Sequence, residues 1–192
     1  MKSISAILVL CLLVSVPLTA FSEVVICPPS LNSVTVDQLV VAKDSYCYLQ
    51  DVEVLGDIRV ESGAILVGSR ISVHGNILAT GADTVFISTD DPDYPSFVGG
   101  SISLVKLDSA QIILTLVEGN LLFAQNTFGL ANSNEISGNL KFVGNDLAQL
   151  NNNWVGKNLI CQGNEEFTII SYRNVVDGNV LAQCEEFVLT ED

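Results

Sequence analysis

The chain repeats one short pattern of apolar and polar residues, mostly at intervals of 19 residues. In each copy an anchor position, usually glycine followed by asparagine, precedes two apolar positions separated by one variable residue. The anchors are Asp37, Gly56, Gly75, Gly100, Gly119, Gly138, Lys157 and Gly178, and two intervals are longer, at 25 and 21 residues. Apolar, variable, apolar alternation is typical of a short strand with one buried face. Self-similarity at so short a period predicts a solenoid.

Two columns of the repeat indicate which side chains face the interior. The position two residues after the anchor is aliphatic in every copy: Leu39, Ile58, Ile77, Ile102, Leu121, Leu140, Leu159 and Val180. The position four residues after it is apolar in every copy and includes Phe123 and Phe142. A coil of about 19 residues accommodates three short strands joined by tight turns. The sequence therefore predicts an all-β parallel β-helix, a single-stranded β-solenoid of seven to eight coils.

The chain divides into three parts. Residues 1–22 predict a secretion signal, with Lys2, an apolar run over 7–16 and small residues before a cut at Glu23. Residues 23–36 contain Cys27-Pro28-Pro29, and because proline has no N–H to donate we expect an N-terminal cap there. Residues 37–192 then form the β-solenoid domain, including a C-terminal cap. No later apolar run reaches spanning length, so we expect no membrane insertion and a secreted or periplasmic location.

Four cysteines follow the signal: Cys27, Cys47, Cys161 and Cys184. An even number in an exported chain points to disulfides. The first two are 20 residues apart, about one coil, and the last two are 23 apart. Pairing between the two groups would have to bridge several coils at ~4.8 Å each, which is beyond the reach of a disulfide. We therefore expect Cys27–Cys47 and Cys161–Cys184.

Recurring small and polar residues mark the corners between strands. Gly63, Gly81, Gly144 and Gly163 recur six or seven residues after their anchors, which predicts a corner with left-handed backbone. Another corner is indicated by Thr115, Asn134, Asn153 and Asn174. A third column holds Asn76, Asn120, Asn139, Asn158 and Asn179. We interpret this column as a structural ladder of stacked amides in preference to a ligand-facing one.

The 25-residue interval contains an insertion, residues 89–96, which is acidic and punctuated by proline. Such a segment is expected to loop outward from the stack. Asp90, Asp91 and Asp93 resemble half of a calcium loop, although the closing glutamate of an EF-hand is absent, so they are weak metal candidates. His74 stands in a varied, mostly polar column and is expected at the surface.

Charge and residue types exclude several functions. The net charge of −14 disfavours nucleic acid and anionic polymers. A lyase acting on acidic sugars needs a cationic groove, whereas the basic residues here are few and scattered. A hydrolase needs converging carboxylates, for which Asp83 and Asp108 on adjacent coils are the candidates. No catalytic residue is predicted.

The start Asp37-Gln38-Leu39-Val40-Val41, the repeated Gly-Asn-aliphatic anchors and the final Cys161 and Cys184 resemble a largely uncharacterised group of secreted bacterial repeat proteins. The resemblance covers nearly all of the chain after the signal and implies a right-handed parallel β-helix. It carries no catalytic motif. The coil rhythm is also similar to that of bactofilins, which are cytosolic polymers without signal peptides or disulfides.

Three functional hypotheses follow. The leading one is an exported, non-enzymatic β-helix that acts as a structural or surface-interaction module, with a cell-surface polysaccharide or protein as partner. The first alternative is a carbohydrate-active β-helix that binds, cleaves or hydrolyses polysaccharide. The second is a calcium-dependent adhesion element using residues 90–93. We expect a monomer, with no cofactor unless calcium binds.

Overall fold

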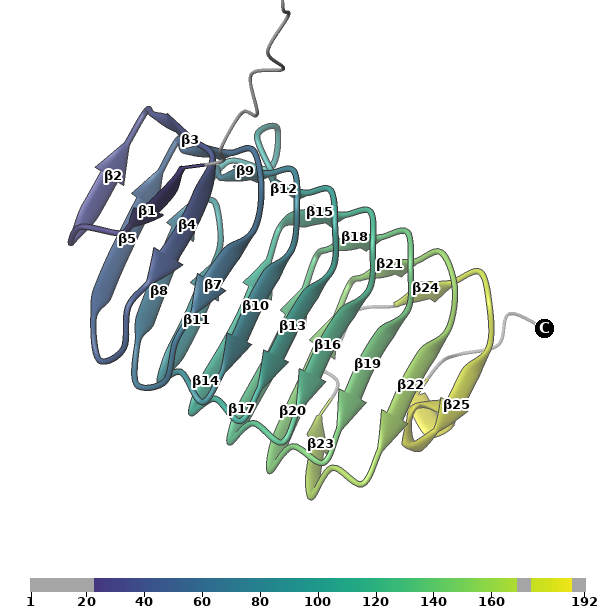
Figure 1. Cartoon of the computed structure of the whole chain (residues 1–192). Coiled ribbons are helices and arrows are strands. Elements are labelled where there is room, and N and C mark those ends of the chain that lie inside the picture. Colours follow the sequence, from purple (N-terminus) through teal and green to yellow (C-terminus); the bar gives the residue numbers. More distant parts are fainter. Residues whose placement is uncertain (1–22, 169–173, 188–192) are drawn as a thin grey trace, which may run out of the picture.

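The chain winds into a parallel β-helix whose strands lie in three sheets, one on each side of the coil (Figure 1). The computed structural model describes residues 23–168 and 174–187. Nearly every coil adds one strand to each sheet, and every pairing in this part of the chain is parallel. The predicted fold class is therefore confirmed.

The first sheet contains β1 (Val24–Ile26), β4 (Gln38–Val41), β7 (Ile58–Val60), β10 (Ile77–Thr80), β13 (Ile102–Val105), β16 (Leu121–Ala124), β19 (Leu140–Val143), β22 (Leu159–Gln162) and β25 (Val180–Ala182). The second contains β2 (Ser30–Asn32), β5 (Tyr46–Gln50), β8 (Ile65–Ser69), β11 (Thr84–Ile87), β14 (Ser109–Ile113), β17 (Phe128–Asn132), β20 (Leu147–Asn151) and β23 (Glu166–Thr168). The third contains β3 (Thr35–Val36), β6 (Glu53–Val54), β9 (Ser72–Val73), β12 (Ser96–Val98), β15 (Thr115–Val117), β18 (Glu135–Ile136), β21 (Trp154–Val155) and β24 (Val175–Val176).

The two apolar columns of the repeat form the core of the first sheet. Equivalent residues of successive coils pair in register, for example Leu121 with Leu140 and Phe123 with Phe142. The rings of Phe123 and Phe142 stack with centroids 4.5 Å apart and planes 4° from parallel. Gly129 of β17 faces these rings, and a Cβ there would lie 3.2 Å from a Phe142 ring carbon. Gly129 thus leaves room for the aromatic stack, because an added Cβ would force the Phe142 ring to shift by a few tenths of an ångström.

The corners use left-handed backbone, as the glycine column predicts. Gly63, Gly81, Gly144 and Gly163 have φ between 64° and 69°. Non-glycine residues, Asp44, Lys106, Gln125 and Ala182, take the equivalent corner in other coils. A second left-handed column lies between the second and third sheets and contains Ser33, Asp51, Arg70, Leu114, Ser133 and Asn152. From Asp51 onward, the residue that follows each of these positions is buried.

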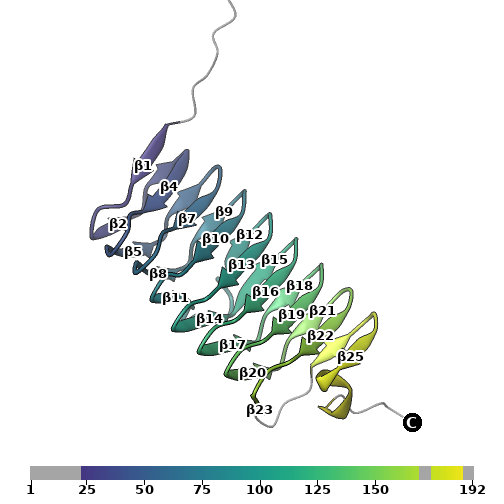
Figure 2. The same ribbon diagram turned by 60° about the horizontal axis from the view of Figure 1, so that its bottom comes forward.

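Residues 23–36, expected as an N-terminal cap, themselves form a coil. Strands β1, β2 and β3 pair with β4, β5 and β6. Pro28 and Pro29 lie between β1 and β2, where the strand ladder does not need their missing N–H. This coil occupies one end of the stack, and the short 3₁₀ helix η1 (Gln183–Phe187) packs against β22 and β25 at the other (Figure 2).

Each end of the solenoid carries one disulfide. Cys27 bonds to Cys47 with Cα atoms 5.9 Å apart, and Cys161 bonds to Cys184 with Cα atoms 5.2 Å apart. These are the two pairs that the coil spacing predicts. The expected secretion signal, residues 1–22, and the last residues, 188–192, lie outside the described part of the chain. Within that part, no helix has the length and apolar character needed to cross a membrane.

Candidate ligand-binding groove on the third sheet

The asparagines predicted to form a ladder lie at the corner between the third and first sheets and connect successive coils. The Nδ2 of Asn139 donates to Asn120 Oδ1 over 2.8 Å, and that of Asn158 donates to Asn139 Oδ1 over 2.9 Å. Asn179 continues the run by donating to Asn158 over 3.1 Å. Asn76 stands apart, since Ser101 separates it from Asn120 and its own amide donates to Asp57. These bonds support the structural interpretation of the column.

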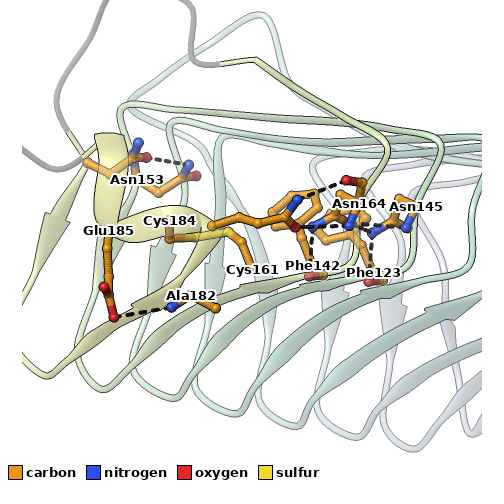
Figure 3. Close-up of a disulfide and its surroundings, with 11 residues drawn as sticks. Phe123, Phe142, Asn145, Asn153, Cys161, Asn164, Ala182, Cys184 and Glu185 are labelled. Carbon is orange, nitrogen blue, oxygen red and sulfur yellow. Dashed lines mark hydrogen bonds between the residues drawn. A yellow bond between two sulfur atoms is a disulfide. The ribbon is translucent and has the colours of Figure 1, made fainter.

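Two further asparagine ladders are buried, and sequence reasoning identified only their corners. One contains Asn126, Asn145, Asn164 and the side chain of Gln183; the other contains Asn134, Asn153 and Asn174. The Nδ2 of Asn145 donates to the Phe123 carbonyl over 3.1 Å and to Asn164 Oδ1 over 2.8 Å (Figure 3). The signal was present, because Asn126, Asn145 and Asn164 are spaced at 19 residues.

The insertion, residues 89–96, turns outward as predicted and stands beside the third sheet (Figure 1). Its two ends are fixed by buried hydroxyl residues, Thr89 and Ser96. The Ser96 Oγ accepts the N–H of Ile71 over 3.2 Å, and the Thr89 Oγ1 accepts the N–H of Asp91 over 3.2 Å. Asp90 to Tyr94 are exposed. The loop is therefore firmly attached at its base and presents its tip to solvent.

The three loop aspartates do not converge. The Oδ1 of Asp91 accepts the N–H of Asp93 over 3.0 Å, which closes a turn within the loop. Over residues 23–168 and 174–187, no group of three or more His, Cys, Asp or Glu side chains is placed to hold a metal ion. The geometry therefore gives Asp90, Asp91 and Asp93 no support as a calcium site.

An open groove of about 590 Å³ lies between this loop and the outer face of the third sheet. Its floor consists of the outward side chains of β6, β9 and β12, namely Glu53, Ser72 and Phe97, which are successive partners in the ladder. One wall is the loop, through Asp91, Tyr94 and Pro95. The other is the left-handed corner, through Asp51 and Arg70. Tyr94 is 65% exposed, the largest exposed fraction among the large apolar side chains described.

Two of the carboxylates in the groove, Asp51 and Glu53, have side-chain partners. Arg70 donates from Nε to Asp51 Oδ1 over 2.6 Å and from Nη2 to Asp51 Oδ2 over 2.8 Å, a bidentate arrangement. This hydrogen-bonded pairing lowers the pKa of the Asp51 carboxyl and raises the pKa of Arg70. Glu53 Oε2 accepts the Thr35 hydroxyl over 3.0 Å, while its Oε1 lies 3.1 Å from His74 Nε2. His74 is exposed, as predicted.

Sequence reasoning missed this groove, although a signal existed. Asp51 and Arg70 are 19 residues apart and thus share one column of the repeat. When residues are aligned by their position in the repeat, Asp51 and Arg70 fall in the same column and carry opposite charges. When the basic residues are considered only in chain order, this pairing is not visible. Asp83 and Asp108 precede the paired residues Thr84 and Ser109 on neighbouring coils, at a different corner from the groove. The structure therefore does not bring them to the groove.

No protein-family model matches the chain, and comparison with curated proteins and with solved structures finds no significant similarity.

Proposed function

We propose that the protein is an exported, non-enzymatic β-helix that acts as a surface-interaction module and binds its partner in the groove beside residues 89–96. The observation that carries the proposal is the coincidence of three features at one place. The insertion that breaks the regular repeat also forms a wall of the groove, and it exposes Tyr94 there. A largely exposed tyrosine beside fixed polar groups is typical of a binding surface, because its ring offers an apolar face and a polar edge.

The pairing of the acidic groups favours binding over catalysis. A general acid or base must exchange its proton with a substrate. Both oxygens of Asp51 are held by Arg70, and its pKa is lowered, so it stays ionised and engaged. Both oxygens of Glu53 also have side-chain neighbours, Thr35 and His74. A carboxylate that is engaged in this way, as Asp51 is, orients a ligand well and transfers protons poorly.

Export is supported by the cysteines. Two disulfides are consistent with an oxidising compartment, and we place the protein in the periplasm or outside the cell. The net charge of −14 keeps an apolar-rich solenoid dispersed and monomeric there. A cell-surface polysaccharide or an exposed protein is the partner that such a location offers.

The test is a panel of purified neutral, acidic and amino polysaccharides and purified extracellular proteins, scored for retention of the protein and for release of reducing ends. Wild type is expected to be retained by at least one member with no release. A variant lacking residues 90–95 restores the 19-residue interval, so it should fold with the same far-UV circular dichroism and lose retention. Arg59→Ala, an exposed change on the first sheet, is the control that should keep it. Turnover of any member, or retention by the deletion variant, would refute the proposal.

A further inference from the structure

A continuous column of outward side chains runs along the third sheet from one end of the stack to the other. In register order it contains Thr35, Glu53, Ser72, Phe97, Leu116, Glu135, Trp154 and Val175. The groove covers the second to fourth members of this column. Trp154 stands three coils further along, and it is 37% exposed. The groove thus opens onto a longer strip on the same face.

The spacing of this strip suits an extended polymer. Neighbouring strands are ~4.8 Å apart, so Phe97 and Trp154 are separated by ~14 Å along the stack. One coil therefore advances by about the length of one pyranose unit in an extended chain. Tyr94, Phe97 and Trp154 provide apolar platforms along the strip, while Glu135 provides a carboxylate between the last two. A polymer with this repeat length places one unit against each successive coil of the strip.

The chemistry of the strip suits a sugar. A pyranose ring has an apolar face of C–H groups, which stacks on aromatic rings, and an edge of hydroxyls, which need both donors and acceptors. The guanidinium of Arg70 has five N–H donors, two of which are used by Asp51, so the pair offers donors and acceptors in one rigid plane. Ser72 adds a hydroxyl to the floor. A few fixed polar groups beside apolar platforms give orientation and affinity together.

The charge of the groove disfavours an anionic sugar. Asp51, Glu53 and Asp91 face one arginine, so an anionic polysaccharide is repelled. Of these three carboxylates, Asp51 is already paired with Arg70. Taking the proposed binding function as given, we propose that the ligand is a neutral, extended polysaccharide that lies along the third sheet from the groove to Trp154.

The test is isothermal titration with neutral β-1,4-linked oligosaccharides of glucose, xylose, mannose and N-acetylglucosamine, from dimers to octamers. For the series that binds, affinity should rise with length until the chain reaches Trp154. Tyr94→Ala should weaken every length by about tenfold, the effect of losing one stacking contact. Trp154→Ala should weaken only the long members, and its circular dichroism should match wild type. Tyr46→Ala, which removes a 49% exposed ring from the second sheet, is the control and should change nothing.

The outcomes separate this inference from the proposed function. Binding of an acidic polysaccharide or a protein, lost on deletion of residues 90–95, would overturn the neutral-glycan inference and leave the binding module intact. A neutral oligosaccharide whose affinity is unaffected by Trp154→Ala at every length would overturn the path along the third sheet. Retention that does not depend on the loop at all would overturn both.

Discussion

At the scale of single residues, the inward side chain at one corner of the coil changes from apolar to asparagine along the stack. The inward position after the left-handed residue is apolar in three successive coils, with Ala64, Ala82 and Leu107, and asparagine in the next three, with Asn126, Asn145 and Asn164. The asparagine amide bonds backbone groups of the preceding coil, as Asn126 does by accepting the N–H of Leu107 over 2.9 Å and donating to the Leu104 carbonyl over 3.1 Å. The buried asparagines therefore replace apolar packing with hydrogen bonds that run along the axis.

Asn145→Ala should destabilise the fold by about 3 kcal/mol, because it leaves buried partners unsatisfied above and below it. The Phe123 carbonyl loses a donor, and the backbone and side-chain N–H groups of Asn126 lose an acceptor. Asn139→Ala removes a similar rung from the exposed ladder, where water replaces the lost partner, and should cost about 1 kcal/mol. Urea unfolding midpoints at unchanged slope measure both. Equal losses would contradict the distinction between the ladders.

The Asp51–Arg70 pair has a testable titration. Because the folded-state pKa of Asp51 lies below its ordinary value of 3.8, the pair stabilises the fold above that value. Its contribution is lost as the pH falls through the lowered pKa. Arg70→Ala should move the pKa of Asp51 back up toward 3.8, measured by carboxyl NMR titration. Arg59→Ala should leave it in place. A pKa of Asp51 indifferent to Arg70→Ala would mean that the pair does not persist in solution.

At the scale of elements, the sequence predicts the strands and corners that recur from coil to coil. It does not predict the elements that depart from the repeat. The first-sheet strands follow from two apolar columns, and the left-handed corners follow from recurring glycines, because every coil imposes the same steric demand. The coil formed by residues 23–36 escaped prediction, since β1 pairs with β4 only 14 residues ahead, for example Val24 with Gln38. The groove escaped because it joins a corner pair to a loop that occurs once, and no periodicity specifies the fold of a single loop.

The inward assignment of β19 makes a prediction at this scale. Phe142 is fully buried and stacked on Phe123. Phe142→Asp should place a charge between Phe123 and Cys161 and destabilise the fold by at least about 4 kcal/mol. Phe142→Leu keeps an apolar side chain and should cost about 1–2 kcal/mol. Thermal denaturation compares the two variants. A Phe142→Asp variant with an unchanged melting temperature would show that β19 presents its other face to the core.

At the scale of the whole molecule, stability is distributed along one axis. Each coil contacts mainly its two neighbours, so terminal coils have half the support of central ones and open more readily. The two disulfides lie at these ends: Cys27–Cys47 joins the first two coils, and Cys161–Cys184 joins β22 to η1. The groove lies closer to the N-terminal disulfide, on coils that this bond helps to hold. The disulfides therefore stabilise the terminal coils, which have a neighbouring coil on one side only.

Removing one disulfide should loosen one end only. Each bond closes a loop of 20 or 23 residues, and by loop-closure entropy each is worth about 3 kcal/mol. In the variant Cys161→Ala with Cys184→Ala, amide exchange should accelerate in β22 and β25 and stay slow in β1 to β9. In the variant Cys27→Ala with Cys47→Ala, amide exchange should instead accelerate at the N-terminal end of the stack and stay slow at the C-terminal end. The central coils, which neither bond encloses, should keep their protection in both variants, measured by exchange and mass spectrometry. If either variant instead loses protection uniformly through β13, β16 and β19, the solenoid unfolds as one unit, and the disulfides stabilise the whole stack instead of its ends.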